Sequence, residues 1–186
     1  GAGEASTAEE TWVLIIRLGG GVRSVERQVN EVVGVSGANG ATGYAVLSDI
    51  TANAAWTILE DSESQSHTII RMTARTSNAL TASHEIATSD LEKDKRISTI
   101  CDLGFGAMTV IADLTNDAES LTFINSTVQT ITKYGGSYLI EKCPVDVKHD
   151  MDVFSDVGNS IDLMRRIKNQ YDPNRTLNPG RFVGKI

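Results

Sequence analysis

Cysteine is scarce in this sequence, which has only Cys101 and Cys143 among its 186 residues. Disulfide-stabilised scaffolds carry several cysteines, and a structural zinc site needs about four ligands in closely spaced pairs. Neither residue has a second cysteine or a histidine within four positions along the chain. Because each lies at or beside a strand-like apolar run, we expect two reduced, buried thiols and neither a disulfide framework nor a zinc site.

Long apolar runs and excess basic charge are also missing. No apolar run approaches the roughly 20 residues that span a bilayer, and no secretory signal is visible. We therefore expect a cytoplasmic protein, with peripheral attachment at the inner face of the membrane as an alternative. The formal net charge is −7, and the basic cluster of Arg165, Arg166 and Lys168 lies near the end of a predicted helix. Cations stabilise a helix C-terminus, so nucleic-acid binding is not expected.

The remaining composition is that of an ordinary globular protein. Apolar residues make up 40 % of the chain and charged residues 22 %. A length of 186 residues is sufficient for one domain with a sizeable core. Residues 1–10 are small and polar, which predicts a linker or the remnant of an engineered terminus. Residues 11–156 are predicted to form one domain, and residues 157–186 a terminal helix and arm.

Hydrophobic periodicity and helix-end signals predict alternating strands and helices. Strands are predicted at 11–18, 67–74, 96–102, 107–113 and 137–141, and helices at 22–33, 43–60, 78–93, 116–134 and 157–170. Asn116 is placed to cap its helix, and Leu103–Gly106 to turn a hairpin between two strands. A hairpin within this order argues against a fully parallel sheet. We predict an α+β fold, in which a ferredoxin-like antiparallel sheet has helices packed on it and an extended C-terminal arm follows.

Two kinds of motif do not predict a ligand site. Gly19–Gly21 separates a predicted strand from a predicted helix, but it lacks the Gly-Lys-Ser/Thr ending of a P-loop and the spaced third glycine of a dinucleotide fingerprint. A flexible turn is the simpler interpretation. His67, His84 and His149 have no other histidine or cysteine two to four residues away. We expect them to be surface or strand-end side chains rather than metal ligands.

The end of the chain carries its most specific pattern. A helical stretch leads into Tyr-Asp-Pro at 171–173, and Leu-Asn-Pro-Gly-Arg-Phe follows at 177–182. Proline cannot continue a helix and displaces the preceding residue from the α region, so the helix is predicted to end at Asp172. Leu177 and Phe182 are predicted to be the apolar anchors of an arm that lies along another surface.

This pattern resembles the C-terminus of FAD-linked oxidases of the vanillyl-alcohol-oxidase type. The likeness is specific over Leu163–Phe182 and weaker over Gly135–Asp152. Within that superfamily, the chain is most similar to the E subunit of glycolate oxidase and its relatives. The resemblance implies a C-terminal cap domain whose arm docks on a flavin-binding domain, with Asn178, Gly180 and Arg181 on the cofactor side.

The sequence departs from the metal-assisted dehydrogenases of that family in two places. After Gly-Gly-Ser at 135–137, Glu141 matches a family glutamate, but Lys142 stands where those proteins have histidine. Residues 102–108 replace their Gly-Asp-Gly-Asn-Leu-His motif and contain no histidine. Because neutral imidazole is a main ligand of such ions, no metal site is expected. Glu141 and Lys142 are therefore candidates for binding substrate rather than metal.

Further basic residues are candidates for the same role. Arg71 and Arg75 lie on a predicted strand and at its exit, and an arginine can bind a carboxylate bidentately. The alternative interpretation is that both are ordinary strand-surface cations. Lys148 and His149 precede the terminal segment, where a cap domain would face its flavin domain. Lys148 is counted among the substrate-binding candidates, and no residue is assigned a catalytic role.

The resemblance implies a function that this chain performs only within a larger protein. No stretch resembles the glycine-rich pyrophosphate-binding segment of the family, so FAD is expected in the full-length subunit and not in this fragment. The subunit would oxidise a glycolate- or lactate-like 2-hydroxy acid, or would transfer electrons with other subunits of a glycolate oxidase-like complex. The isolated chain is expected to be inactive. The alternative is a stand-alone ferredoxin-like module for small-molecule binding or oligomerisation, which has no evident need for the 177–182 arm.

Overall fold

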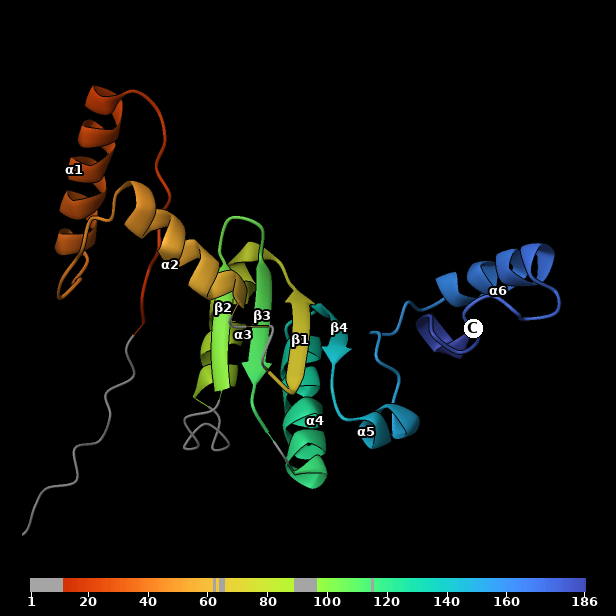
Figure 1. Ribbon diagram of the computed structural model, residues 1–186. Coiled ribbons are helices and arrows are strands. Elements are labelled where there is room, and N and C mark those ends of the chain that lie inside the picture. Colours follow the sequence, from red (N-terminus) through yellow and green to blue (C-terminus); the bar gives the residue numbers. More distant parts are fainter. Residues whose placement is uncertain (1–11, 62, 64–65, 89–96, 115) are drawn as a thin grey trace, which may run out of the picture. The chain divides into compact units, whose positions relative to one another are not determined.

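The computed structural model in Figure 1 describes residues 12–61, 63, 66–88, 97–114 and 116–186. The linker predicted at 1–10 and the predicted helical residues 89–93 lie outside this part. The described chain forms two compact units, and their boundary falls between Ala52 and Asn53, within helix α2 (Asp49–Asp61). The domain limits predicted from the sequence stay predictions.

The first unit contains helix α1 (Val22–Ala38) and the start of α2, joined by chain without regular secondary structure. The helix predicted at 22–33 is confirmed and continues to Ala38. The strand predicted at 11–18 is wrong for the described residues 12–18, which pair with no strand. An apolar run has the propensity to form a strand, but only a neighbouring strand supplies the hydrogen bonds that fix it. None of the described side chains from 12 to 52 is buried.

Helix α2 begins at Asp49 and not at residue 43 as predicted. Ser48 accounts for this start because its backbone N–H donates to Thr51 Oγ1 at 3.3 Å and its carbonyl accepts from the same hydroxyl at 2.7 Å. The Thr51 hydroxyl thus supplies a partner for the Ser48 N–H, as the side chain three residues after the cap does in a capping box. The apolar residues before Ser48 do not carry such a signal.

The second unit contains a four-stranded antiparallel sheet in the order β2-β3-β1-β4. Its strands are β1 (Thr68–Thr73), β2 (Ile97–Asp102), β3 (Ala107–Ala112) and β4 (Ser137–Lys142). Helix α3 (Thr76–Ala87) joins β1 to β2, and helix α4 (Asp117–Lys133) joins β3 to β4. Each helix therefore connects two strands that are separated by a third. This is the ferredoxin-like arrangement that the sequence predicted.

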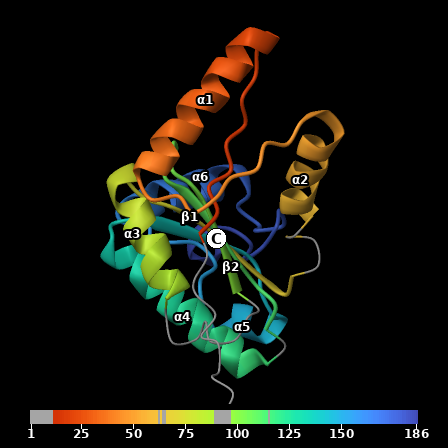
Figure 2. The ribbon, with the colours of Figure 1, turned by 90° about the vertical axis from the view of Figure 1, so that its left-hand side faces the viewer.

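Helices α3 and α4 cover one face of the sheet, as Figure 2 shows with the sheet turned by 90°. Alternate strand residues point into this layer, as the period of a pleated strand requires. The buried core consists mainly of Ile70, Met72, Met108, Val110 and Ile140 from the strands, Ala79, Ala82 and Ile86 from α3, and Phe123, Ile124 and Ile131 from α4. Complete burial of a large apolar side chain contributes about 1.5–3 kcal/mol, so this layer is the main source of stability.

Helix α4 has defined signals at both ends. The Asn116 side-chain oxygen accepts from the backbone N–H groups of Ala118 at 2.9 Å and Glu119 at 3.3 Å, which confirms the predicted cap. Gly136 follows the helix. A Cβ atom there would lie 2.6 Å from Thr73 O, so only glycine fits between α4 and the start of β4.

Helix α5 (Val145–Asp150) follows β4, in a stretch between the predicted strand 137–141 and the predicted helix 157–170 where the sequence predicted no regular structure. That prediction was wrong because six residues are too few to show helical periodicity. Pro144 precedes the first turn, where proline is tolerated, and Val147 is buried in the core. Helix α6 (Ser160–Tyr171) and the 3-10 turn η2 (Val183–Lys185) complete the chain.

The opposite face of the sheet is the more polar one. It carries Arg71 at its centre, with Thr109 and Leu139 as the cross-strand neighbours of this arginine. Ile69 and Ile111 form a buried cross-strand pair on the same face. Among the described residues, helices α3 and α4 pack on the other face of the sheet and not on this one. We call it the open face of the sheet.

Candidate functional site

Arg71 is the centre of a charged cluster on the open face. Its Nε donates to Glu141 Oε2 on β4, while Nη2 donates to Glu63 Oε2 at 2.6 Å and Nη1 to Glu63 Oε1 at 3.3 Å. Nη1 also lies 3.4 Å from Thr109 Oγ1 on β3. The antiparallel register brings β3 and β4 to the two sides of β1, which explains why residues far apart in sequence meet here.

The cluster carries an excess of negative charge, since two carboxylates face one guanidinium. Hydrogen bonds to Glu63, and then to Glu141, raise the pKa of Arg71 above its usual value, so this group is a permanent cation. The side chains remain partly hydrated, with 43 % of Arg71 and 27 % of Glu63 exposed. Ion pairs of this exposure contribute only about 0.2–1 kcal/mol, so the cluster adds little to the stability of the fold.

The four predicted substrate-binding residues do not all meet in this cluster. Arg71 and Glu141 are in contact, whereas Lys142 is half-buried at the end of β4. Lys148 is exposed on α5, a helix whose Val147 packs into the core on the helix-covered side. Arg75 is exposed at the start of α3. The structure thus joins one predicted pair and adds Glu63, which the sequence did not point to.

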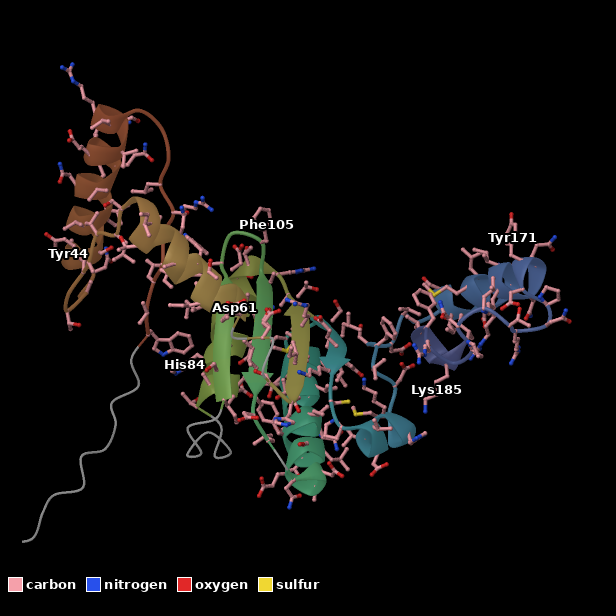
Figure 3. The ribbon with its side chains drawn as sticks, viewed as in Figure 1. Tyr44, Asp61, His84, Phe105, Tyr171 and Lys185 are labelled. Carbon is pink, nitrogen blue, oxygen red and sulfur yellow. The ribbon has the colours of Figure 1, made fainter. Side chains whose placement is uncertain are left out.

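The hairpin between β2 and β3 is confirmed, and it has a well-defined tip. Asp102 Oδ1 accepts from the backbone N–H groups of Gly104 at 3.0 Å and Phe105 at 3.3 Å. Gly106 has a φ of +66°, and a Cβ atom at this position would lie 2.1 Å from Ala74 O. These constraints leave Phe105, labelled in Figure 3, exposed at the tip. An exposed aromatic side chain on a rigid turn is typical of contact surfaces.

No group of three or more His, Cys, Asp or Glu side chains is placed to hold a metal ion in the described part of the chain. His67 pairs with Asp113 at the end of β3, and the carbonyl of His149 accepts from Lys185 Nζ at 3.1 Å. Cys143 is buried and Cys101 half-buried, and both are free thiols whose pKa is raised by burial. The predicted absence of a bound metal stays a prediction.

The C-terminal arm leaves α6 at Asp172, which is the predicted position. It is held there by polar contacts of Asp172 and Lys168 with Thr176 and Leu177, which we call the latch. Asp172 is only 5 % exposed. It accepts from the backbone N–H groups of Thr176 at 2.8 Å and Leu177 at 3.0 Å, and from Lys168 Nζ at 2.7 Å. Lys168 also donates to Leu177 O at 2.6 Å. Hydrogen bonds, first from Lys168 and then from the Leu177 backbone, hold the pKa of Asp172 well below its ordinary value.

The predicted apolar anchors of the arm need correction. Leu177 is 63 % exposed and Phe182 is 51 % exposed, so neither is buried. Phe182 does contact the domain, because its ring lies edge-on to Phe154 with centroids 5.6 Å apart. The buried apolar residue of the arm is Val183, and the next residue, Gly184, donates its N–H to Asp152 Oδ2 at 2.8 Å. The sequence prediction of the arm rested on its prolines and apolar residues, but polar contacts hold most of the arm in place.

Asn178, Gly180 and Arg181, the predicted cofactor-side residues, are all exposed. Asn178 has a φ of +43° and Gly180 a φ of +70°, both in the left-handed region. The backbone N–H of Arg181 donates to Asn178 O at 3.2 Å, so the three residues form one turn. Among the described residues, no partner of the Arg181 guanidinium is found. The turn therefore presents this cation to solvent.

Helix α6 has an exposed apolar stripe. Leu163, Ile167 and Tyr171 are spaced four residues apart, and all three are exposed; Tyr171 is labelled in Figure 3. No residue of α6, which is described over its full length, is buried. Residues 155–186 contain six basic and three acidic side chains, although the whole chain is acidic. An amphipathic helix with an uncovered apolar stripe is typical of an interface.

Comparison with known families finds a likeness in the C-terminal segment. Residues 155–182 match the family described as FAD linked oxidases, C-terminal domain. Comparisons with curated proteins and with solved structures gave no match. Within the described part, no helix is both long and apolar enough to cross a membrane. The matched segment contains α6, the latch and the arm, and it supports the interpretation of this chain as a C-terminal domain of an FAD-linked oxidase.

Proposed function

We propose that this chain is the cap domain of an FAD-dependent oxidase or dehydrogenase of 2-hydroxy acids, similar to the E subunit of glycolate oxidase. The observation that carries the proposal is the family match over residues 155–182. The ferredoxin-like sheet, with α3 and α4 packed on one face and the charged cluster of Arg71 on the other, is consistent with a domain that covers a reaction centre held by another domain.

The C-terminal segment is proposed to dock on the flavin-binding domain. Support comes from the uncovered stripe of Leu163, Ile167 and Tyr171, since large apolar residues contribute most when they are buried against a partner. The latch around Asp172 fixes the path of the arm beside this stripe. A helix and an arm held in one geometry lose little further entropy on docking.

Two polar residues of the arm, Asn178 and Arg181, fit the diphosphate of FAD. Phosphate oxygens accept from guanidinium and amide N–H groups, which Arg181 and Asn178 present to solvent. These side chains supply no apolar surface for a flavin ring, so the ring would be held by the flavin-binding domain. When bound, FAD supplies the electron-accepting chemistry, and the role of this chain is to orient substrate and complete the enclosure.

The open face of the sheet is proposed to be the substrate side. Arg71 is its central cation, and the planar fork of arginine suits the carboxylate of a 2-hydroxy acid. Glu141 holds the Nε side of the guanidinium and so fixes its plane. Lys142, at the end of β4, is retained as a further candidate for the anionic substrate, whereas Lys148 lies on α5, which packs on the helix-covered side.

A direct test is anaerobic mixing of the full-length flavoprotein with glycolate or lactate while the visible flavin absorbance is followed. The proposal predicts bleaching by a 2-hydroxy acid and none by acetate, which lacks the hydroxyl that is oxidised. The 186-residue chain alone should not retain added FAD after desalting. A full-length protein that lacks flavin, or flavin that no 2-hydroxy acid reduces, would contradict the proposal.

A further inference from the structure

Glu63 occupies the position on Arg71 that an external carboxylate would take. Its two oxygens face the two terminal nitrogens of the guanidinium at 2.6 and 3.3 Å, which is the fork-to-fork geometry of carboxylate recognition. Glu141 accepts a hydrogen bond only from Nε, and the hydroxyl of Thr109 lies 3.4 Å from Nη1. The two terminal nitrogens of Arg71, which could bind an external carboxylate with two hydrogen bonds, are therefore already paired with Glu63.

The two glutamates are held differently. Glu141 is a residue of β4, and the antiparallel pairing of β4 with β1 fixes it beside Arg71. Glu63 belongs to no strand or helix and lies in the connection between α2 and β1. Exchange at the guanidinium is consequently easier for Glu63, whose backbone is not part of the sheet.

An external carboxylate and Glu63 exclude each other at Arg71. Together with Glu141 they would place three carboxylates around one guanidinium, and the like charges would repel. We propose that Glu63 is an internal competitor that fills the carboxylate site of Arg71 and must be displaced when an anionic ligand binds. This inference rests on the proposed function for the choice of Arg71 as the ligand-binding cation, but not for the chemical identity of the ligand.

The expected size of the effect follows from the exposure of the pair. Because both side chains are partly hydrated, with exposed fractions of 43 % and 27 %, the internal pair is of modest strength. The apparent affinity for an external anion is reduced by the fraction of molecules in which the site is free. Removal of Glu63 should therefore tighten carboxylate binding by about threefold to fivefold.

The test uses the full 186-residue chain and sodium acetate as the probe, at constant ionic strength. Binding is followed on the Nε–H resonance of Arg71 by NMR, in wild type, Glu63→Gln and Glu85→Gln. Glu85 is the matched control because it also forms an exposed pair, with Lys133 at 2.9 Å, but on the helix-covered side. Glu63→Gln should bind acetate about threefold to fivefold more tightly, and Glu85→Gln should bind it as wild type does.

Two further variants make the result decisive. Glu63→Ala removes the same carboxylate without leaving an amide and should show the same gain. Arg71→Lys, which keeps the charge but loses the fork, should abolish the gain when binding is followed on the backbone amide resonances of residue 71 and Thr109, which all variants retain. Equal affinities in Glu63→Gln and Glu85→Gln, or a gain that persists with Arg71→Lys, would overturn the inference. Titration with glycolate separates this inference from the proposed function. Equal binding of glycolate and acetate would count against a 2-hydroxy acid and leave the displacement of Glu63 intact.

Discussion

Two regions of the chain are stabilised in different ways. The first is the sheet with its helices α3 and α4, and the second is the C-terminal segment from Asp152 to Lys185. The first buries a continuous set of large apolar side chains, with Phe123 and Ile70 almost inaccessible. The second buries Asp172 and Val183 but leaves its apolar stripe on α6 uncovered. The sheet layer thus has the features of a self-sufficient core, and the C-terminal segment those of a surface prepared for a partner.

The largest effect is expected in the core. Phe123→Ala should lower the free energy of unfolding of the chain by about 3–5 kcal/mol, because it removes buried contacts and leaves a cavity. The matched change on the surface, Ile167→Ala in α6, should alter it by less than about 0.5 kcal/mol. Urea denaturation of both variants measures the difference. Similar losses in the two variants would remove the distinction between core and surface.

The next effect appears only in the full-length protein. Ile167→Glu places a charge in the centre of the uncovered stripe and should weaken docking of the flavin-binding domain by roughly tenfold or more, as at a central interface residue. Flavin retained after gel filtration measures this. Asn169→Glu adds the same charge at an exposed position of α6 outside the stripe and should have little effect. Equal flavin retention in the two variants would show that the stripe is not the interface.

A smaller effect concerns the arm itself. Asp172→Asn removes the negative charge of the latch, so the amides of Thr176 and Leu177 should exchange faster with solvent, while the melting temperature of the chain shifts by less than about 2 °C. Thr176→Ala is the control, since it removes one hydroxyl donor and keeps the carboxylate. Unchanged exchange in Asp172→Asn would mean that other contacts order the arm.

The latch also has a defined dependence on pH. The pKa of Asp172 is lowered in the folded chain, so its stabilising contribution is complete above the ordinary aspartate value of about 3.9 and disappears as the pH falls through the folded-state value. The Thr176 and Leu177 amides should therefore stay protected from neutral pH to about pH 4 and lose protection only in more acidic solution. Loss of protection already at pH 6 would contradict this assignment.

The smallest predicted effect compares two helix starts. Asn116 caps α4 with two side-chain hydrogen bonds, whereas Asn159 at the start of α6 makes none. Asn116→Ala should cost about 1 kcal/mol, and Asn159→Ala should be close to neutral. Equal costs would indicate that α6 also contributes to the cooperative fold.

The contrast between the two regions also explains what the sequence could predict. All four strands of the sheet were predicted within one or two residues, because each is a short run rich in β-branched and apolar residues. Asn116 was identified because capping is local. The strand at 11–18 failed for the opposite reason, since pairing depends on a partner that no local pattern reveals.

The candidate site was predictable only in part. The sequence identified Arg71 and Glu141 separately, but their contact depends on the register between β1 and β4. Glu63 carried no signal, as it lies in a connection outside regular structure. The latch could have been predicted from the four-residue spacing of Lys168 and Asp172 and from the aspartate before Pro173, since aspartate side chains commonly accept hydrogen bonds from the backbone that follows them. Prolines and apolar residues instead directed the prediction to Leu177.

Amide hydrogen exchange of α6, compared between the full-length flavoprotein and the 186-residue chain, tests the central claim most directly. If this chain is a cap domain whose C-terminal segment docks on the flavin-binding domain, the amides of α6 should exchange more slowly in the full-length protein, while those of β1 and β3 stay unchanged. Equal exchange of α6 in the two proteins would contradict the claim.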